Sequence, residues 1–283
     1  MMVEFPNIPK NEQSLKWFLL LEPLILARSS KPKPKESKLL DVLNGGQNWK
    51  HIKALIEIAL KTCVNAEKIL SRKSQINKDS DPDGIINDLF AELKAIPYLI
   101  CKGFSEIIYN KVNNVDFTAT FNGEKYGIEV TYVRGPSFKT QKIAFKNSIG
   151  PSFKTKEPAL KNPISPVYRL DSKKLISRFK TKYQEKNKQI LKHGYNSSNA
   201  IILIISDLDE THEHCLNHDL IEGKHPIDYF VSNTIIPTVV LGNGSLYEPH
   251  QKPFNQLQPF TWENYEKLIS DNYRKQNEFI RCC

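Results

Sequence analysis

The chain has 283 residues, enough for one sizeable hydrophobic core with accessory elements or for two small domains. Its hydrophobic content of 40% and charged content of 25% are ordinary for a soluble globular protein. The formal net charge is +9, and its longest apolar stretch, residues 17–27, is too short to cross a bilayer and contains Glu22 and Pro23.

The cysteines and the N-terminal residues indicate the cellular compartment. The five cysteines are odd in number and include no C-x-x-C pair, which is typical of a reducing compartment. Glu4 and Glu12 argue against a secretory signal. We therefore expect a cytoplasmic protein without a membrane partner.

Residues 1–80 are predicted to be a helical extension with linkers. A short apolar helix is expected over 14–27, broken near Pro23, and a basic proline-containing linker follows. Apolar residues at helical spacing predict a second helix over 49–71, and the polar residues 71–83 predict another linker. The sequence assigns no chemistry to this extension.

A helix with a clear start is predicted from position 82 to about 102. Asp81 is a good N-cap and Pro82 suits the first helical position. Glu92 stands at the margin of the predicted buried face, where a lone glutamate is most often solvated. A short strand is expected next, over 104–109.

Residues 113–134 carry the strongest hairpin signal in the chain. Asn122 and Gly123 separate two runs in which apolar and polar residues alternate. With a two-residue loop, Asp116 lies directly opposite Glu129 on the polar face, with Cβ atoms about 5 Å apart. A β-bulge would shift this register by one residue.

Two carboxylates so placed repel each other unless something compensates their charge. A divalent cation is a common solution, and hard oxygen ligands suit magnesium. The alternative is that both side chains face water at the surface of the sheet.

A basic region follows the hairpin. Between positions 134 and 192 there are 16 Lys and Arg residues and three acidic residues, a surplus larger than that of the whole chain. Within it, residues 135–149 recur as 150–164 with ten of fifteen positions identical, which indicates a local duplication that lengthened a loop. The surplus suggests a polyanionic partner such as nucleic acid, while the alternatives are a solubilising surface and a tolerated insertion.

The remaining elements alternate between helix and strand. A helix is predicted over about 171–192, with Lys182, Lys186 and Gln189 along one edge of its apolar stripe. A buried strand over 199–206, a helix over 226–236, a strand over 238–241 and a last helix over 261–280 follow. This alternation predicts an α/β fold with a parallel portion.

The polar segment 207–219 offers a separate metal hypothesis. Its His212, His214, Cys215 and His218 could bind zinc, although the flanking pattern matches no known zinc scaffold. An ordinary polar loop after a strand is the simpler interpretation.

The order of these elements resembles the PD-(D/E)XK nuclease superfamily. A helix with Glu92, a strand, the hairpin with Asp116 and Glu129, a basic helix and a buried strand are similar to its restriction-endonuclease-like αβββαβ core, over about residues 82–206. The resemblance implies an α/β fold with a mixed central sheet. The expected divisions are the extension 1–80, a core at 81–245 with a basic insertion at 135–164, and a helical tail at 246–283.

The resemblance also implies site residues. Asp116, Glu129 and the Val130 carbonyl correspond to the metal ligands, and Glu92 corresponds to the helical acid of many members. Thr131 departs from the family, since it occupies the lysine position two residues after the second acid. In some members this lysine has migrated to the following helix, where Lys182 is the first choice here and Lys186 the second, and Gln189 resembles the polar residue often found there.

We therefore expect a magnesium-dependent endonuclease acting on DNA rather than RNA, of restriction or host-defence type. Many such nucleases form homodimers to cut both strands. One alternative is a nucleic-acid-binding module that has lost cleavage, favoured by Thr131, and another is a zinc-stabilised interaction protein.

Overall fold

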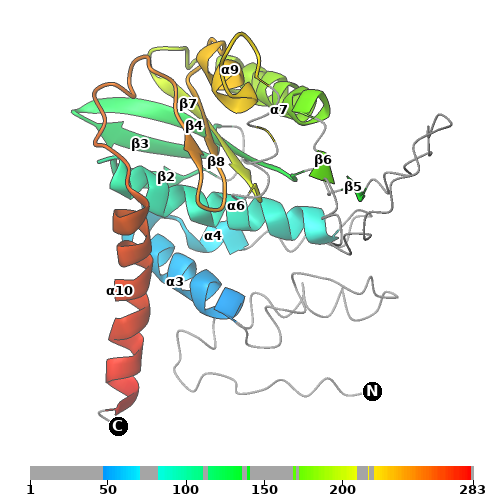
Figure 1. Ribbon diagram of the computed structural model, residues 1–283. Helices are drawn as coiled ribbons and strands as arrows, with labels where there is room; N and C mark the ends of the chain where they lie inside the picture. The colour runs from blue at the N-terminus through cyan, green and yellow to red at the C-terminus, as the bar shows by residue number, and fades with distance from the viewer. Residues whose placement is uncertain are drawn as a thin grey trace, which may run out of the picture.

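The computed structural model describes residues 47–70, 82–110, 114–135, 139–140, 168–169, 172–208, 216 and 220–281. These residues form a mixed α/β fold with a seven-stranded sheet between layers of helices (Figure 1). In chain order, the helices are α3 Gln47–Thr62, α4 Glu67–Leu70, α6 Pro82–Cys101, α7 Ser172–Lys192, α9 Pro226–Ser232 and α10 Trp262–Arg281. The strands of the large sheet are β1 Cys63–Val64, β2 Ser105–Tyr109, β3 Phe117–Phe121, β4 Glu124–Val133, β7 Ala200–Ser206, β8 Thr238–Leu241 and β9 Leu246–Tyr247.

The sheet is mixed, with strand order β1-β2-β3-β4-β7-β8-β9. Strands β2, β3 and β4 are antiparallel neighbours, whereas β4, β7 and β8 are parallel to one another. All seven residues of β7 are buried, as expected for a parallel strand covered on both faces. Two further short strands, β5 Lys139–Thr140 and β6 Tyr168–Arg169, pair with each other outside this sheet.

The hairpin between β3 and β4 has the predicted register. Phe121 pairs with Glu124 and Phe117 pairs with Ile128. Asn122 and Gly123 both have positive φ, 50° and 79°, as a two-residue turn of type I′ requires. The β3–β4 pairing is regular, whereas the pairing of β2 with β3 has a bulge or irregularity between Ser105 and Ile108.

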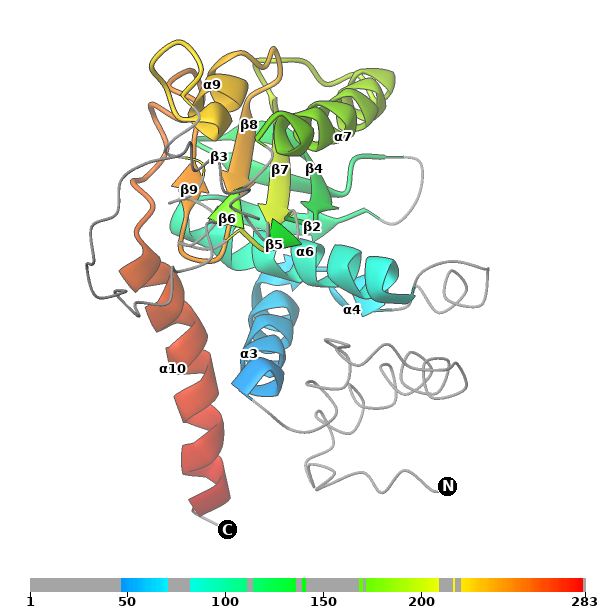
Figure 2. The ribbon, with the colours of Figure 1, turned by 45° about the vertical axis from the view of Figure 1, so that its right-hand side comes forward.

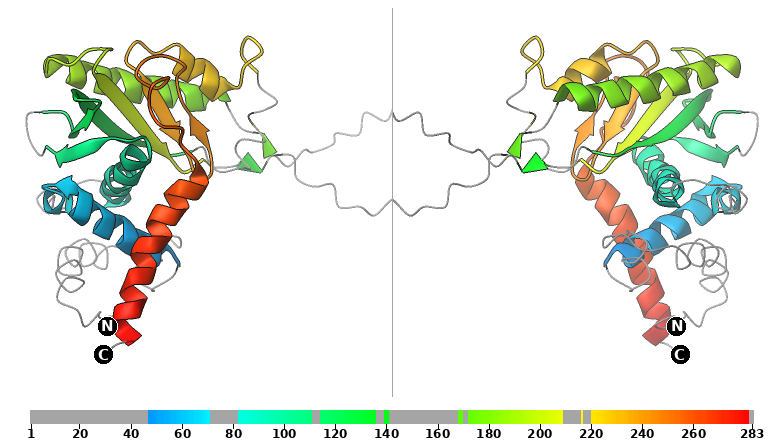
Figure 3. Two further views of the ribbon diagram at one scale, coloured as in Figure 1. Left: turned by 90° about the vertical axis from the view of Figure 1, so that its left-hand side faces the viewer. Right: turned by 90° about the vertical axis from the view of Figure 1, so that its right-hand side faces the viewer.

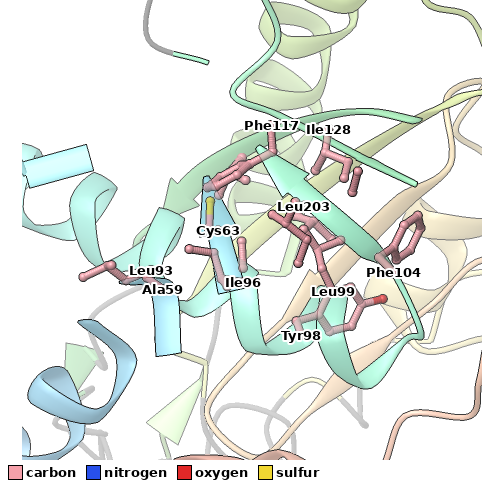
Figure 4. Close-up of a cluster of buried hydrophobic side chains, with 14 of the residues drawn as sticks. Ala59, Cys63, Leu93, Ile96, Tyr98, Leu99, Phe104, Phe117, Ile128 and Leu203 are labelled. Carbon is pink, nitrogen blue, oxygen red and sulfur yellow. The ribbon is translucent and has the colours of Figure 1, made fainter. Parts of the chain in front are cut away.

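The larger hydrophobic core lies between the sheet and α6. Phe117, Ile128 and Leu203 on three adjacent strands pack against the face of α6 that carries Ile96 and Leu99 (Figure 4). All five side chains are at most 1% exposed, and burial stabilises the fold by roughly 1.5–3 kcal/mol for each such side chain. This packing fixes the apolar face of the hairpin and directs its polar face to the other side of the sheet.

Helix α7 covers that other side. Leu175 and Phe179 of α7 form a second core with Ile202 and Ile204 of β7 and with Phe230 of α9. Figure 2 shows α7 above β4 and β7, with α6 below the sheet. The polar face of the hairpin therefore lies beneath a basic helix.

The chain around α3 and the chain after β8 differ from the predictions. The helix predicted over 49–71 ends at Thr62, because Asn65 has a φ of 64° and the short β1 and α4 follow. Helix α9 ends at Ser232 rather than at 236, and β9 adds a strand where only a helical tail was expected. Helices α3 and α10 pack on α6, away from the sheet, and share its core (Figure 3).

None of the helices that the structure describes is both long enough and apolar enough to span a membrane.

Candidate active site

Two carboxylates from adjacent strands meet on the α7 side of the sheet. Asp116 directly precedes β3, and Glu129 lies in the middle of β4 at the position that the hairpin register sets opposite it. Glu129 is only 2% exposed, and the Asp116 side chain is 17% exposed. The alternative in which both side chains face water is therefore wrong.

The main chain of β4 holds Asp116 in place. The Val130 N–H donates a hydrogen bond to Asp116 Oδ2 over 2.8 Å. Because the N–H and C=O of a strand residue point to the same side, the Val130 carbonyl is directed toward β3 as well. This strand edge thus presents two carboxylates and one carbonyl.

Lys186 of α7 contacts both carboxylates. Its Nζ lies 2.7 Å from Glu129 Oε2 and 3.1 Å from Asp116 Oδ2. Helix α7 runs antiparallel to β4, since Arg178 donates to the carbonyl of Arg134 at the far end of that strand, 3.1 Å away. This orientation of α7 places the Lys186 ammonium group beside both acids.

Burial and charge shift the protonation equilibria of this group. Burial, and after it the negative charge of Asp116, raise the pKa of Glu129 to about 8 against the opposing effect of Lys186. Burial lowers the pKa of Lys186, but the charges of Asp116 and Glu129 outweigh this effect and raise it overall. The lysine is thus held as a cation, whereas Glu129 readily takes up a proton near neutral pH even with Lys186 beside it.

The nearest neighbours of the two carboxylates on this face of the hairpin are uncharged. Thr131 follows Glu129 on the same face and is 7% exposed, and Thr118 of β3 is 2% exposed. Gly127 leaves room for the ring of Tyr195, since a Cβ atom there would lie 2.6 Å from the ring. Along β4, Glu129 therefore lies between Gly127, against which Tyr195 packs, and the Arg134 end of the strand.

The structure revises the choice among the helix residues. Lys182, the first choice for the migrated lysine, has Nζ 2.8 Å from Glu185 and a side chain that is 43% exposed. The second choice, Lys186, is the residue at the carboxylates. Four residues turn a helix by about 400°, so the two lysines differ by about 40° in direction, and only the packing of α7 decides which one meets the sheet. Gln189 is exposed on α7.

Glu92 lies apart from this group. It is buried on α6, 4% exposed, and α6 packs on the opposite face of the sheet. Its expected exposure to solvent is therefore wrong, and its role as a helical acid stays a prediction.

The donors present fit a hard divalent cation. Mg²⁺ is commonly bound by one or two carboxylates, with water and substrate phosphate completing its coordination, and the Asp116–Glu129 pair with the Val130 carbonyl supplies that set. Among the described residues no group of three or more His, Cys, Asp or Glu side chains gathers. Lys186 provides part of the charge compensation that the sequence attributed to a metal.

Two predicted features lie outside the described residues. These are the zinc hypothesis at His212, His214, Cys215 and His218, and nearly all of the duplicated segment at 135–164.

Sequence reasoning missed the contact between Gly127 and Tyr195. A glycine within a strand pattern is a signal of close approach by another group, and the pattern of β4 contains one. The sequence could therefore have indicated the contact, though not the residue that makes it.

Comparisons of the chain with protein-family models, with curated proteins and with solved structures each found no match.

Proposed function

We propose that this protein is a magnesium-dependent endonuclease with a restriction-endonuclease-like core, which hydrolyses phosphodiester bonds of DNA. The observation that carries the proposal is the meeting of Asp116, Glu129 and Lys186, from three separate elements, on one buried face of the sheet. Two acids can hold a metal for phosphodiester hydrolysis, and a lysine can stabilise the negative charge that develops on the phosphate.

The order of elements supports the same function. Helix α6, the antiparallel strands β2, β3 and β4, helix α7 and the parallel strand β7 follow one another in the αβββαβ order that the sequence resembles. Asp116 directly precedes the second strand of this series, Glu129 lies on the third, and Lys186 lies on the helix after them.

Each residue has a defined part in the proposed reaction. Asp116, Glu129 and the Val130 carbonyl would hold Mg²⁺, which acts as a Lewis acid and lowers the pKa of bound water. Lys186 would donate hydrogen bonds to a phosphate oxygen and offset its growing negative charge. Burial beneath α7 strengthens these interactions, because charges interact more strongly away from bulk water.

The proposal is tested by cleavage of plasmid and oligonucleotide DNA with and without Mg²⁺. Asp116→Asn, Glu129→Gln and Lys186→Gln should each reduce metal-dependent cleavage by at least about 100-fold, as removal of an electrostatic catalytic group typically does. Lys180→Gln, an exposed lysine of the same helix, is the matched control and should retain cleavage. Undiminished cleavage by the Asp116 or Glu129 variant would refute the assignment.

A second function is favoured by the ion pairs themselves. Lys186 already contacts both acids, and Thr131 stands where the family carries its lysine, so the protein could bind nucleic acid without cutting it. Calorimetric titration with Mg²⁺ separates the two functions. The enzyme should bind the metal in a way that Asp116→Asn abolishes, whereas the binding module should show no such dependence.

A further inference from the structure

Helix α7 is the most basic element that the structure describes. It carries eight Lys and Arg residues and one acidic residue, Glu185. Only Lys186 among these cations contacts the carboxylate pair, so the proposed reaction leaves the others without a function. The eight cations are Lys173, Lys174, Arg178, Lys180, Lys182, Lys186, Lys188 and Lys192.

Four of these cations form a row with a spacing of four residues. Lys174 and Arg178 are exposed, the Lys182 side chain is 43% exposed and that of Lys186 is 17% exposed. Each step of four residues advances about 6 Å along the helix and about 40° around it. The row therefore turns progressively from solvent toward the sheet and ends at Asp116 and Glu129.

This row lies on the flank of α7 that faces away from α9. Phe179 and Tyr183 contact Phe230 of α9, whereas Lys186 reaches Asp116 at the β3 side. The row also follows β4, since Arg178 bonds to Arg134 at the end of the strand and Lys186 bonds to Glu129 in its middle. Lys173, Lys180 and Lys188 point to the outer face and the α9 side of the same helix, by their helical positions.

We propose that Lys174, Arg178 and Lys182 form a track for the backbone of one nucleic-acid strand, which leads its phosphates to Lys186. This inference rests on the proposed nuclease function and specifies how the substrate lies. Successive cations advance about 6 Å along the helix while winding around it, so the row can follow the phosphates of one strand, and such contacts position a substrate without reading its sequence.

Two details fit this track. The Nη1 of Arg178 bonds to the Arg134 carbonyl, which fixes the guanidinium while its other N–H groups remain able to donate. Glu185 pairs with Lys182 over 2.8 Å and lies beside the track, where its carboxylate opposes an incoming phosphate. Removing that charge should therefore strengthen binding.

The test measures binding of the full chain to a labelled mixed-sequence duplex, and to its single strand, without divalent metal. In the triple variant Lys174→Gln, Arg178→Gln, Lys182→Gln, the negative slope of log K against log salt should become shallower by about 2–3, since each phosphate contact contributes about 0.7–0.9. Affinity should fall at least about tenfold, and Glu185→Gln should raise it. The matched control is Lys173→Gln, Lys180→Gln, Lys188→Gln, which removes the same charge from the other side of α7 and should change the slope by less than about one.

Equal weakening by both triple variants would overturn the track, because the nucleic acid would then respond to total charge. No weakening by either variant, or weaker binding by Glu185→Gln, would overturn it as well. A wild-type protein that never cuts DNA, but whose binding depends on the track alone, would refute the nuclease function and leave the track standing. If the track variant cuts DNA as well as the wild type does, the track is refuted and the nuclease function stands.

Discussion

At the scale of single residues, Lys186 has the largest expected effect on the site. Its ammonium group lies between two carboxylates, one of them almost fully buried. Removing one member of a buried charged group leaves the others desolvated and uncompensated. The stability of the fold and the chemistry of the site are therefore linked through this side chain.

We expect Lys186→Met to destabilise the protein by on the order of 3 kcal/mol in the absence of divalent metal, because it removes the counter-charge that Asp116 and Glu129 share and leaves protonation of Glu129 as the way to avoid their repulsion. Added Mg²⁺ should restore more stability to this variant than to the wild type, because a ligand that binds only the folded state stabilises it. Urea unfolding with and without Mg²⁺ measures both effects.

Lys182→Met is the control for this experiment. It breaks only the exposed pair with Glu185 and should cost less than about 1 kcal/mol. A Lys186→Met protein as stable as the wild type would show that the acids do not depend on the lysine.

The largely buried His51, on α3, makes the stability of the fold depend on pH. Burial, and after it the charge of Lys94, lower the pKa of His51 to about 4. The unfolded chain therefore binds a proton between pH 6.5 and 4 that the folded protein does not, so stability falls as the pH drops through this range. Between pH 7 and 5 we expect a loss of about 2 kcal/mol from this residue.

Denaturant unfolding at several pH values measures the effect. His51→Gln should flatten the profile between pH 7 and 5, whereas His250→Gln, at an exposed position, should keep the wild-type profile. An unchanged slope in His51→Gln would assign the pH dependence to other groups.

At the scale of elements, the hairpin and helix α7 show what a sequence can and cannot predict. The turn at Asn122 and Gly123, with alternation on both sides, specifies the register that brings the two acids together. The rotation of α7 about its axis is set by Leu175 and Phe179 against the second core, which local spacing does not reveal. Strands of two residues, such as β1 and β9, have no period to detect.

Strand β4 also carries a steric requirement that can be tested. A Cβ atom on Gly127 would lie 2.6 Å from the Tyr195 ring, which cannot withdraw as the end of a flexible chain can. We expect Gly127→Ala to cost about 1–3 kcal/mol in unfolding free energy.

A double-mutant cycle with Tyr195→Ala checks this cause. With the ring removed, Gly127→Ala should cost much less, so the two changes should be strongly non-additive. Additive effects would mean that the strand backbone, and not the ring, requires the glycine.

At the scale of the whole molecule, the segments outside the predicted core are integrated with it. Lys102 at the end of α6 is 2% exposed and bonds to Glu248 over 3.0 Å, and Tyr98 donates to the same carboxylate over 2.6 Å. Tyr265 and Ile269 of α10 belong to the main hydrophobic core. Residues of the predicted C-terminal tail, 246–283, therefore pack against the predicted core.

We expect Glu248→Gln to destabilise the whole fold by on the order of 3 kcal/mol, since it leaves the buried Lys102 ammonium without its counter-charge. Thermal or urea unfolding should show one cooperative transition that is shifted as a whole. Lys94→Gln, which removes an exposed hydrogen bond to Asn243, is the control and should cost less than about 1 kcal/mol. A separate early transition in Glu248→Gln would show that the C-terminal segment unfolds independently.

The ends of the large sheet bear on how two copies of the protein could meet. Both outermost strands, β1 and β9, contain two residues, so each offers few free backbone groups for pairing with another chain. Within the part of the chain that the structure describes, addition of a strand from a second copy is therefore disfavoured. If cutting both strands of a duplex requires two copies, their contact should consist of side chains on helices and loops, and it can be disrupted there without disturbing the sheet.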